Sequence, residues 1–130
     1  MRRSPTILAP ATALAAILAL SACSRQLEPP TDRGVCYHIA TTKDGKVRFN
    51  PVAQNVPDLE HCAAQLEAMR LRFVGLGSPN REIAGAYQGS FLFLQREGVF
   101  TSQTADGVRY PFLARTGDGR LATPGSMPPQ

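Results

Sequence analysis

Two cysteines and both histidines of the chain fall into two short clusters that could carry chemistry. Cys36 and His38 are two positions apart, and His61 and Cys62 are adjacent. If the clusters meet in the fold, two thiolates and two imidazoles form a ligand set that suits zinc or copper. The spacings match no standard metal motif, however. The sequence therefore favours a Cys36–Cys62 disulfide flanked by two ordinary histidines, with a metal-binding protein or small enzyme built around Cys36, His38, His61 and Cys62 as the alternative.

Other signatures of catalysis are weak. The chain has no Cys-x-x-Cys and no Gly-x-Ser-x-Gly sequence. Gly75-Leu76-Gly77 follows a predicted helix, whereas a phosphate loop precedes one. The carboxylates are scattered over predicted turns and a polar helix face, so they predict no catalytic pair. We therefore expect no cofactor and no enzymatic activity.

A predicted strand and a predicted helix position the two clusters. Residues 35–41 are rich in β-branched and aromatic side chains, and positions 36 and 38 of such a strand share one face. A helix is expected to begin after Asp58, a good N-cap, and to end at Gly75 and Gly77. Apolar residues recur in it at spacings of three and four, which predicts one inward stripe: Leu59, Cys62, Leu66, Met69, Phe73 and Leu76. Cys36 and Cys62 can then meet at the strand–helix interface.

The opposite face of this helix is polar and is expected to be solvated. It consists of Glu60, Gln65, Glu67, Arg70 and Arg72. Together with Arg81, the two arginines could form a basic patch for lipid head groups or an acidic partner.

The remaining segments predict a small antiparallel sheet. Strands are expected over residues 47–52, 86–95, 99–103 and 108–115, with a short one over 120–122 and turns at the Asp-Gly pairs. The fold class is α+β, in ββαβββ order, with the amphipathic helix packed on one face of the sheet. Five aromatics are expected in the core: Tyr87, Phe91, Phe93, Tyr110 and Phe112. The sheet face away from the helix, if uncovered, is a partner-binding surface.

The first 22 residues have the pattern of an export signal. Arg2 and Arg3 precede an apolar run over residues 7–20 that ends in small residues, as in a secretory signal peptide. The run is shorter than the roughly 20 residues that span a bilayer. The formal net charge is +4, and two of the basic residues lie in this leader. The charge that remains is too small to favour nucleic acid as a partner.

The end of the leader, Leu20-Ser21-Ala22-Cys23, resembles the type II signal peptidase site of bacterial lipoproteins. The resemblance implies cleavage before Cys23, a diacylglyceryl thioether on its sulfur and an acylated amino group, which would anchor the protein in a membrane. Ser24 rather than aspartate in the next position favours the outer over the inner membrane. The alternative is an ordinary signal peptide that is cut after Ala22.

The expected organisation is a signal peptide (1–22), a lipidated cysteine with a flexible tether (23–33), one α+β domain (34–122) and a disordered tail (123–130). An exported protein meets an oxidising compartment, which permits a disulfide closing a loop of about 27 residues. The sequence thus predicts a lipid-anchored periplasmic protein without enzymatic activity. We expect it to be an interaction or accessory module that binds the membrane through acyl chains on Cys23 and docks on an unknown envelope protein.

Overall fold

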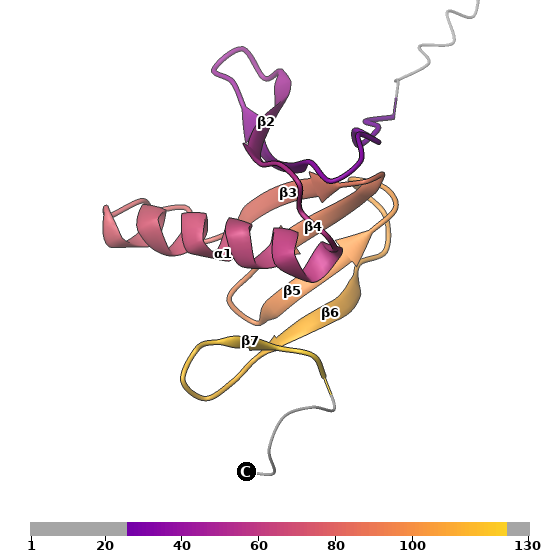
Figure 1. The fold of residues 1–130 in the computed structure, drawn as a ribbon. Coiled ribbons are helices and arrows are strands. Elements are labelled where there is room, and N and C mark those ends of the chain that lie inside the picture. Colours follow the sequence, from indigo (N-terminus) through magenta and orange to yellow (C-terminus); the bar gives the residue numbers. More distant parts are fainter. Residues whose placement is uncertain (1–25, 125–130) are drawn as a thin grey trace, which may run out of the picture.

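A computed structural model describes residues 26–124, which form one helix and one antiparallel sheet. The sheet has seven strands in the order β2-β1-β3-β4-β5-β6-β7. The helix is α1 (Leu59–Gly75), and it lies across one face of the sheet (Figure 1). The strands are β1 (Cys36–Thr41), β2 (Val47–Ala53), β3 (Ile83–Tyr87), β4 (Ser90–Leu94), β5 (Gly98–Ser102), β6 (Tyr110–Arg115) and β7 (Leu121–Ala122). The predicted α+β class with one helix on one face is confirmed.

Helix α1 begins and ends where its capping residues predict. The side chain of Asp58 accepts a hydrogen bond of 2.8 Å from the backbone N–H of His61, and so satisfies one free donor of the first turn. At the other end, the N–H of Ser78 donates to the carbonyl of Phe73 and the N–H of Gly77 donates to that of Val74. This Schellman arrangement requires a left-handed residue, and Gly77 has a φ of 82°.

Two hairpin turns have the same sequence pattern, Thr-x-Asp-Gly followed by a basic residue. In the β1–β2 turn the hydroxyl of Thr42 bonds to Asp44, and the Thr42 N–H donates to the carbonyl of Lys46 at 2.8 Å. The β6–β7 turn, residues 116–120, repeats both bonds with the same backbone distance of 2.8 Å. Asp44-Gly45 and Asp118-Gly119 therefore form the turns that the sequence predicts, whereas Asp106-Gly107 lies in the longer β5–β6 connection (103–109) and forms no tight turn.

The predicted single strand over residues 86–95 is wrong, because it consists of parts of β3 and β4 joined by a tight turn. Gln88 and Gly89 have φ values of 44° and 84°, so both central residues of this turn are left-handed. Glutamine seldom adopts that conformation, whereas Asn-Gly and Asp-Gly do so readily. Two bonds hold the turn in place. The Gln88 side chain accepts from the N–H of Gly34 at 2.8 Å, and Gly89 donates to the carbonyl of Pro30 at 2.9 Å.

The core lies between α1 and the sheet, and it is tightest where the helix crosses β3. Cys62, Ala63 and Leu66 are fully buried on the helix, opposite Leu92, Leu94 and Val99 of the sheet. At the crossing point β3 has Gly85. A Cβ on this residue would lie 2.7 Å from the carbonyl oxygen of Tyr37 and would clash with Leu66. The absence of a side chain at position 85 thus sets how closely the helix approaches the sheet.

The substitution Gly85→Ala is expected to lower the free energy of unfolding by about 1–3 kcal/mol, since the added methyl group overpacks the interface. Gly75→Ala is the matched control, because a Cβ there meets no atom within 4 Å and alanine favours helix. Chemical denaturation of both variants checks this. Equal stability of the two variants would contradict the close packing at Gly85.

The sheet has two distinct ends. At the proximal end, where residues 26–34 join the domain, lie the start of β1, the Gln88–Gly89 turn and the β5–β6 loop (103–109). At the distal end lie the β1–β2 turn, the end of α1 and the β4–β5 turn. Figure 1 shows the N-terminal segment entering beside the turns of the proximal end, while α1 runs toward the distal end and projects beyond the sheet.

Candidate functional site: a cleft at the distal end of the sheet

The two cysteines of the predicted corner are joined. Cys36 at the start of β1 and Cys62 in the first turn of α1 form a disulfide with their Cα atoms 5.4 Å apart. Both residues are fully buried, and β3 covers the bridge: Tyr87, opposite Cys36, is part of the same core cluster. The predicted disulfide is present. Its sulfur atoms are bonded to each other, so this state of the corner offers no thiolate to a metal.

The two histidines have different surroundings. His61 is exposed, and its ring nitrogen lies 2.6 Å from the carboxylate of Asp58, its N-cap neighbour. His38 contacts the other half of the helix, with its ring 6.0 Å from that of Phe73 in an edge-on arrangement. Within residues 26–124, no three His, Cys, Asp or Glu side chains gather as a metal ligand set. His38, however, lies in a cleft.

The cleft opens where β1 and β3 separate. The two strands are paired as far as Ile39 and Ala84. Beyond that point β1 continues beside β2 through Thr41, and β3 begins at Ile83 beside β4. The gap between them is a cleft of about 540 Å³ at the distal end of the sheet. Because it passes between two strands, it reaches both the helix side of the sheet and the opposite side.

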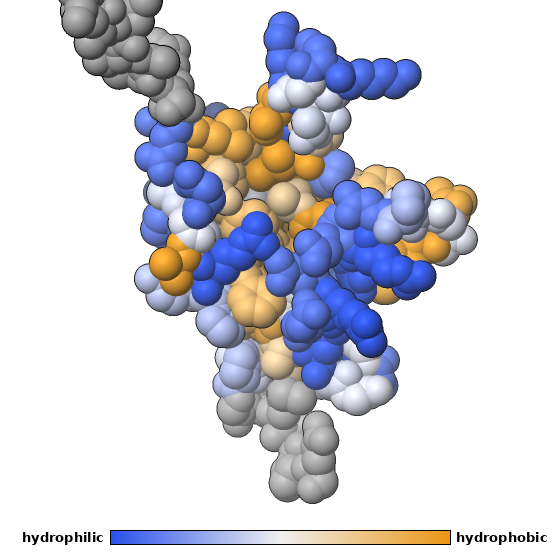
Figure 2. Space-filling model, turned by 180° about the vertical axis from the view of Figure 1, so that it is seen from behind, coloured by the Kyte–Doolittle hydropathy of each residue, from blue (hydrophilic) through white to orange (hydrophobic). Residues whose placement is uncertain are grey.

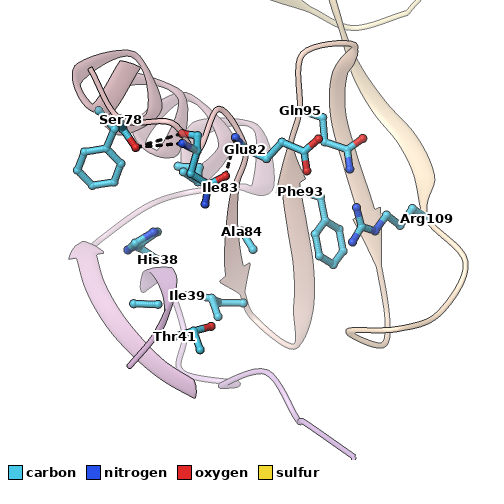
Figure 3. A pocket seen from close by; sticks show the side chains of 13 residues that line it. His38, Ile39, Thr41, Ser78, Glu82, Ile83, Ala84, Phe93, Gln95 and Arg109 are labelled. Atoms are coloured by element: carbon cyan, nitrogen blue, oxygen red, sulfur yellow. Dashed lines mark hydrogen bonds between the residues drawn. The ribbon is translucent and has the colours of Figure 1, made fainter. Parts of the chain in front are cut away.

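The cleft is lined by both polar and apolar side chains. Figure 3 shows His38, Ile39 and Thr41 from β1 on one side of β3, with Phe93 and Arg109 on the other. Ala84 lies between them on β3, and Ser78 and Glu82 belong to the loop that follows α1. The lining therefore offers a bound molecule apolar contact as well as several groups that can form hydrogen bonds.

His38 is an uncharged polar group in this cleft at neutral pH. Burial lowers the pKa of its imidazole below the ordinary value, since the charged form loses hydration there. Among the described residues, none forms a hydrogen bond with the His38 ring; its neighbour is the aromatic ring of Phe73. The imidazole therefore has no hydroxyl to activate, and its free ring nitrogens can bond to a bound molecule.

Arg109 supplies the positive charge at the opposite margin. Its guanidinium carbon lies 3.7 Å from the centre of the Phe93 ring, which is a cation–π contact. Every ion pair of the described part of the chain involves other side chains, so Arg109 has no carboxylate partner there. The charge is thus fixed in place by an aromatic ring and remains available to an anionic group. The sequence gives no signal for this residue, because the loop that contains it is brought to Phe93 only by the fold.

The distal half of α1 adds exposed apolar surface beside the cleft. The predicted inward stripe is confirmed for Leu59, Cys62, Leu66 and Met69, which pack into or against the core. Phe73 and Leu76, its last two members, are exposed. Leu76 is 85% exposed and Leu71 is 56% exposed, because the helix extends past the edge of the sheet that would cover them. We call Leu71, Phe73 and Leu76 the helix overhang.

The sheet face away from α1 also carries apolar side chains. Cys36 faces the helix, so by alternation Tyr37 and Ile39 face the other way, opposite Ala86 and Ala84 of β3. Figure 2 shows apolar surface gathered on this face below the β1–β2 hairpin, surrounded by polar residues. Phe91 and Phe93 are buried there as predicted, Phe112 is half-buried, and Tyr110 is 60% exposed, which contradicts its predicted core position.

The polar face of α1 was predicted incorrectly at two positions. Glu67 is buried, and its carboxylate accepts hydrogen bonds from both Arg70 and Arg115, with 2.6 Å between the Arg115 Nη1 and Glu67 Oε1 atoms. Arg70 also donates to the carbonyl of Arg81, so its guanidinium is not part of an open basic patch. The helix is rotated so that Glu67 faces β6, where Arg115 compensates its charge.

The lipoprotein features lie outside the described residues. The leader and Cys23 precede residue 26, and most of the predicted tail follows residue 124. Within the predicted tether, Pro30 accepts from Gly89 and Asp32 accepts from the Tyr37 hydroxyl at 2.7 Å. The described part of the chain contains no helix that is long and apolar enough to cross a membrane.

The site combines a mixed cleft, one guanidinium without a carboxylate partner among the described residues, one neutral imidazole and the exposed helix overhang. No protein-family model, no curated protein and no solved structure matches the chain.

Proposed function

We propose that this chain is a lipid-anchored periplasmic module that binds another protein of the cell envelope through its distal cleft and helix overhang. The observation that carries the proposal is the exposure of Leu71, Phe73 and Leu76 beside a cleft of about 540 Å³. Exposed apolar side chains next to a cleft cost free energy in water and are typical of protein interaction sites. The Leu20-Ser21-Ala22-Cys23 sequence and the buried disulfide support an exported, anchored protein.

The chemistry of the cleft favours binding over catalysis. Aromatic and arginine side chains dominate the energetics of protein interfaces, and here Phe73, Phe93 and Arg109 surround the opening. A partner segment with apolar side chains and a carboxylate would cover Phe73 and Phe93 with its apolar side chains. Its carboxylate would pair with Arg109. A buried carboxylate–guanidinium pair of this kind gives orientation as well as affinity.

The proposal is tested by site-specific photo-crosslinking in intact cells. A photoreactive residue at Leu76 is expected to trap a defined envelope protein, and adding Phe73→Asp and Arg109→Ala to the same chain is expected to abolish its recovery. The matched position is Glu60, which is also exposed on α1 but lies at the proximal end. The same adducts from both positions would contradict a specific distal site.

Anchoring is measured on the same protein. Growth with a labelled fatty acid should label the wild type and leave the Cys23→Ala variant unlabelled and absent from the membrane fraction. Label that persists in the Cys23→Ala variant would show that Cys23 is not the lipidated residue.

A further inference from the structure

Two neighbouring apolar side chains at the proximal end have no place in the core. Val108 is 69% exposed, and Tyr110, which begins β6, is 60% exposed. The site at the distal end does not use them. Single exposed apolar residues are common, but these two lie two positions apart in one loop–strand junction.

The register of the sheet places this junction near Pro30, where the N-terminal segment joins the domain. Tyr110 pairs with Thr101 of β5, which pairs with Leu92 of β4. Two strand spacings, about 10 Å, therefore separate Tyr110 from β4. The turn that precedes β4 holds Gly89, which is bonded to Pro30. Figure 1 shows the N-terminal segment and the β5–β6 connection at the same end of the sheet.

The chain between the anchor and the domain is short. Cys23 and Pro30 are seven positions apart in the sequence, a length of at most about 25 Å when fully extended. Because the Pro30 carbonyl is hydrogen-bonded to the domain, this length is all that separates the proximal end from acyl chains on Cys23.

We propose that the proximal end of the domain rests on the lipid bilayer, with Val108 and Tyr110 inserted at the level of the head groups. This inference rests on the proposed lipid anchor at Cys23. Tyrosine is enriched at membrane interfaces because its ring is apolar and its hydroxyl stays hydrated. Arg109 lies between the two in the sequence, but its guanidinium is held over the Phe93 ring, so the contact depends on apolar insertion and zwitterionic lipid suffices.

The chain contains no tryptophan, so a single introduced tryptophan reports its own surroundings. Tyr110→Trp is compared with Leu71→Trp, a position of similar exposure (60% and 56%) in the distal half of α1. The lipidated protein is reconstituted into phosphatidylcholine vesicles, with or without brominated phosphatidylcholine as quencher. Emission from Tyr110→Trp is expected to shift to shorter wavelength and to fall about twofold with the brominated lipid. Emission from Leu71→Trp is expected to stay unchanged.

Flotation of the vesicles separates the two possible failures. Protein that floats with the vesicles but shows no quenching at position 110, or equal quenching at positions 110 and 71, overturns the proposed orientation and leaves the anchor intact. Protein that does not float overturns the anchor at Cys23, and the orientation with it. Val108→Trp serves as a second probe and is expected to behave as Tyr110→Trp does.

Discussion

Replacing Cys36 and Cys62 together by alanine is expected to lower the free energy of unfolding by about 3–4 kcal/mol. The disulfide closes a loop between residues 26 positions apart, and so it restricts the unfolded chain more than the folded one. Small domains bury little surface, and a loss of this size is a large share of their total stability. Both cysteines are fully buried, so the alanines also remove packing from the core.

Urea denaturation in mild detergent, with and without reductant, measures this effect. The wild type should unfold at a clearly lower urea concentration in reductant, whereas the double variant should not respond to reductant. A wild type whose unfolding midpoint is the same in both conditions would show that the bridge contributes nothing to stability.

The second large effect is expected at Glu67. Its carboxylate accepts hydrogen bonds from Arg70 and Arg115, and the side chains of all three are at most 14% exposed. Arg115 also donates to the carbonyl of Gln95, so the cluster joins α1, β6 and the β4–β5 turn. Glu67→Ala leaves two nearly buried guanidinium groups without their partner, which is expected to cost about 3–5 kcal/mol. Glu60→Ala, a change of the exposed glutamate on the same helix, should stay within about 0.5 kcal/mol.

The Glu67 cluster also predicts a pH dependence. Burial raises the pKa of Glu67, but hydrogen bonds and charge from Arg70 and Arg115 lower it more, to about 2, below its ordinary value of 4.5. Because the folded-state pKa is depressed, the stabilisation is complete above the unfolded-state value and disappears as the pH falls through about 2.

The pH dependence is measured as the stability difference between the wild type and the isosteric Glu67→Gln variant. This difference should be largest near neutral pH and should shrink as the pH falls below about 4. A difference that is independent of pH would mean that Glu67 acts through packing rather than through its charge.

Local signals in the sequence account for the elements that were predicted correctly. Asp58 and Gly77 mark the ends of α1 because capping depends on residues next to each other in the chain. The turns at Asp44-Gly45 and Asp118-Gly119 form for the same reason. The Gln88–Gly89 turn was missed because it is held by long-range bonds to Gly34 and Pro30, which override the weak preference of glutamine for left-handed backbone.

The site was harder to predict, because its parts meet only through the topology of the sheet. The disulfide followed from two cysteines on facing elements, and the structure bears it out. The cleft depends on where β1 and β3 stop pairing, and nothing in either strand's composition marks that point. Glu67 looked like a solvated residue because its partner Arg115 is far away in the sequence. The role of Arg109 could not be predicted, because its contact with the Phe93 ring depends on the fold.

The position of the disulfide also determines how the domain would carry mechanical load. A pull on the proposed lipid anchor would enter the domain through Pro30 and Gly34 and reach β1 at Cys36. An antiparallel strand pulled from one end peels away one hydrogen bond at a time, and β1 lies between β2 and β3 in the sheet. Because the first residue of β1 is covalently tied to α1, the force passes into the helix and the core instead. The distal cleft would therefore keep its shape while the proposed anchor is under tension.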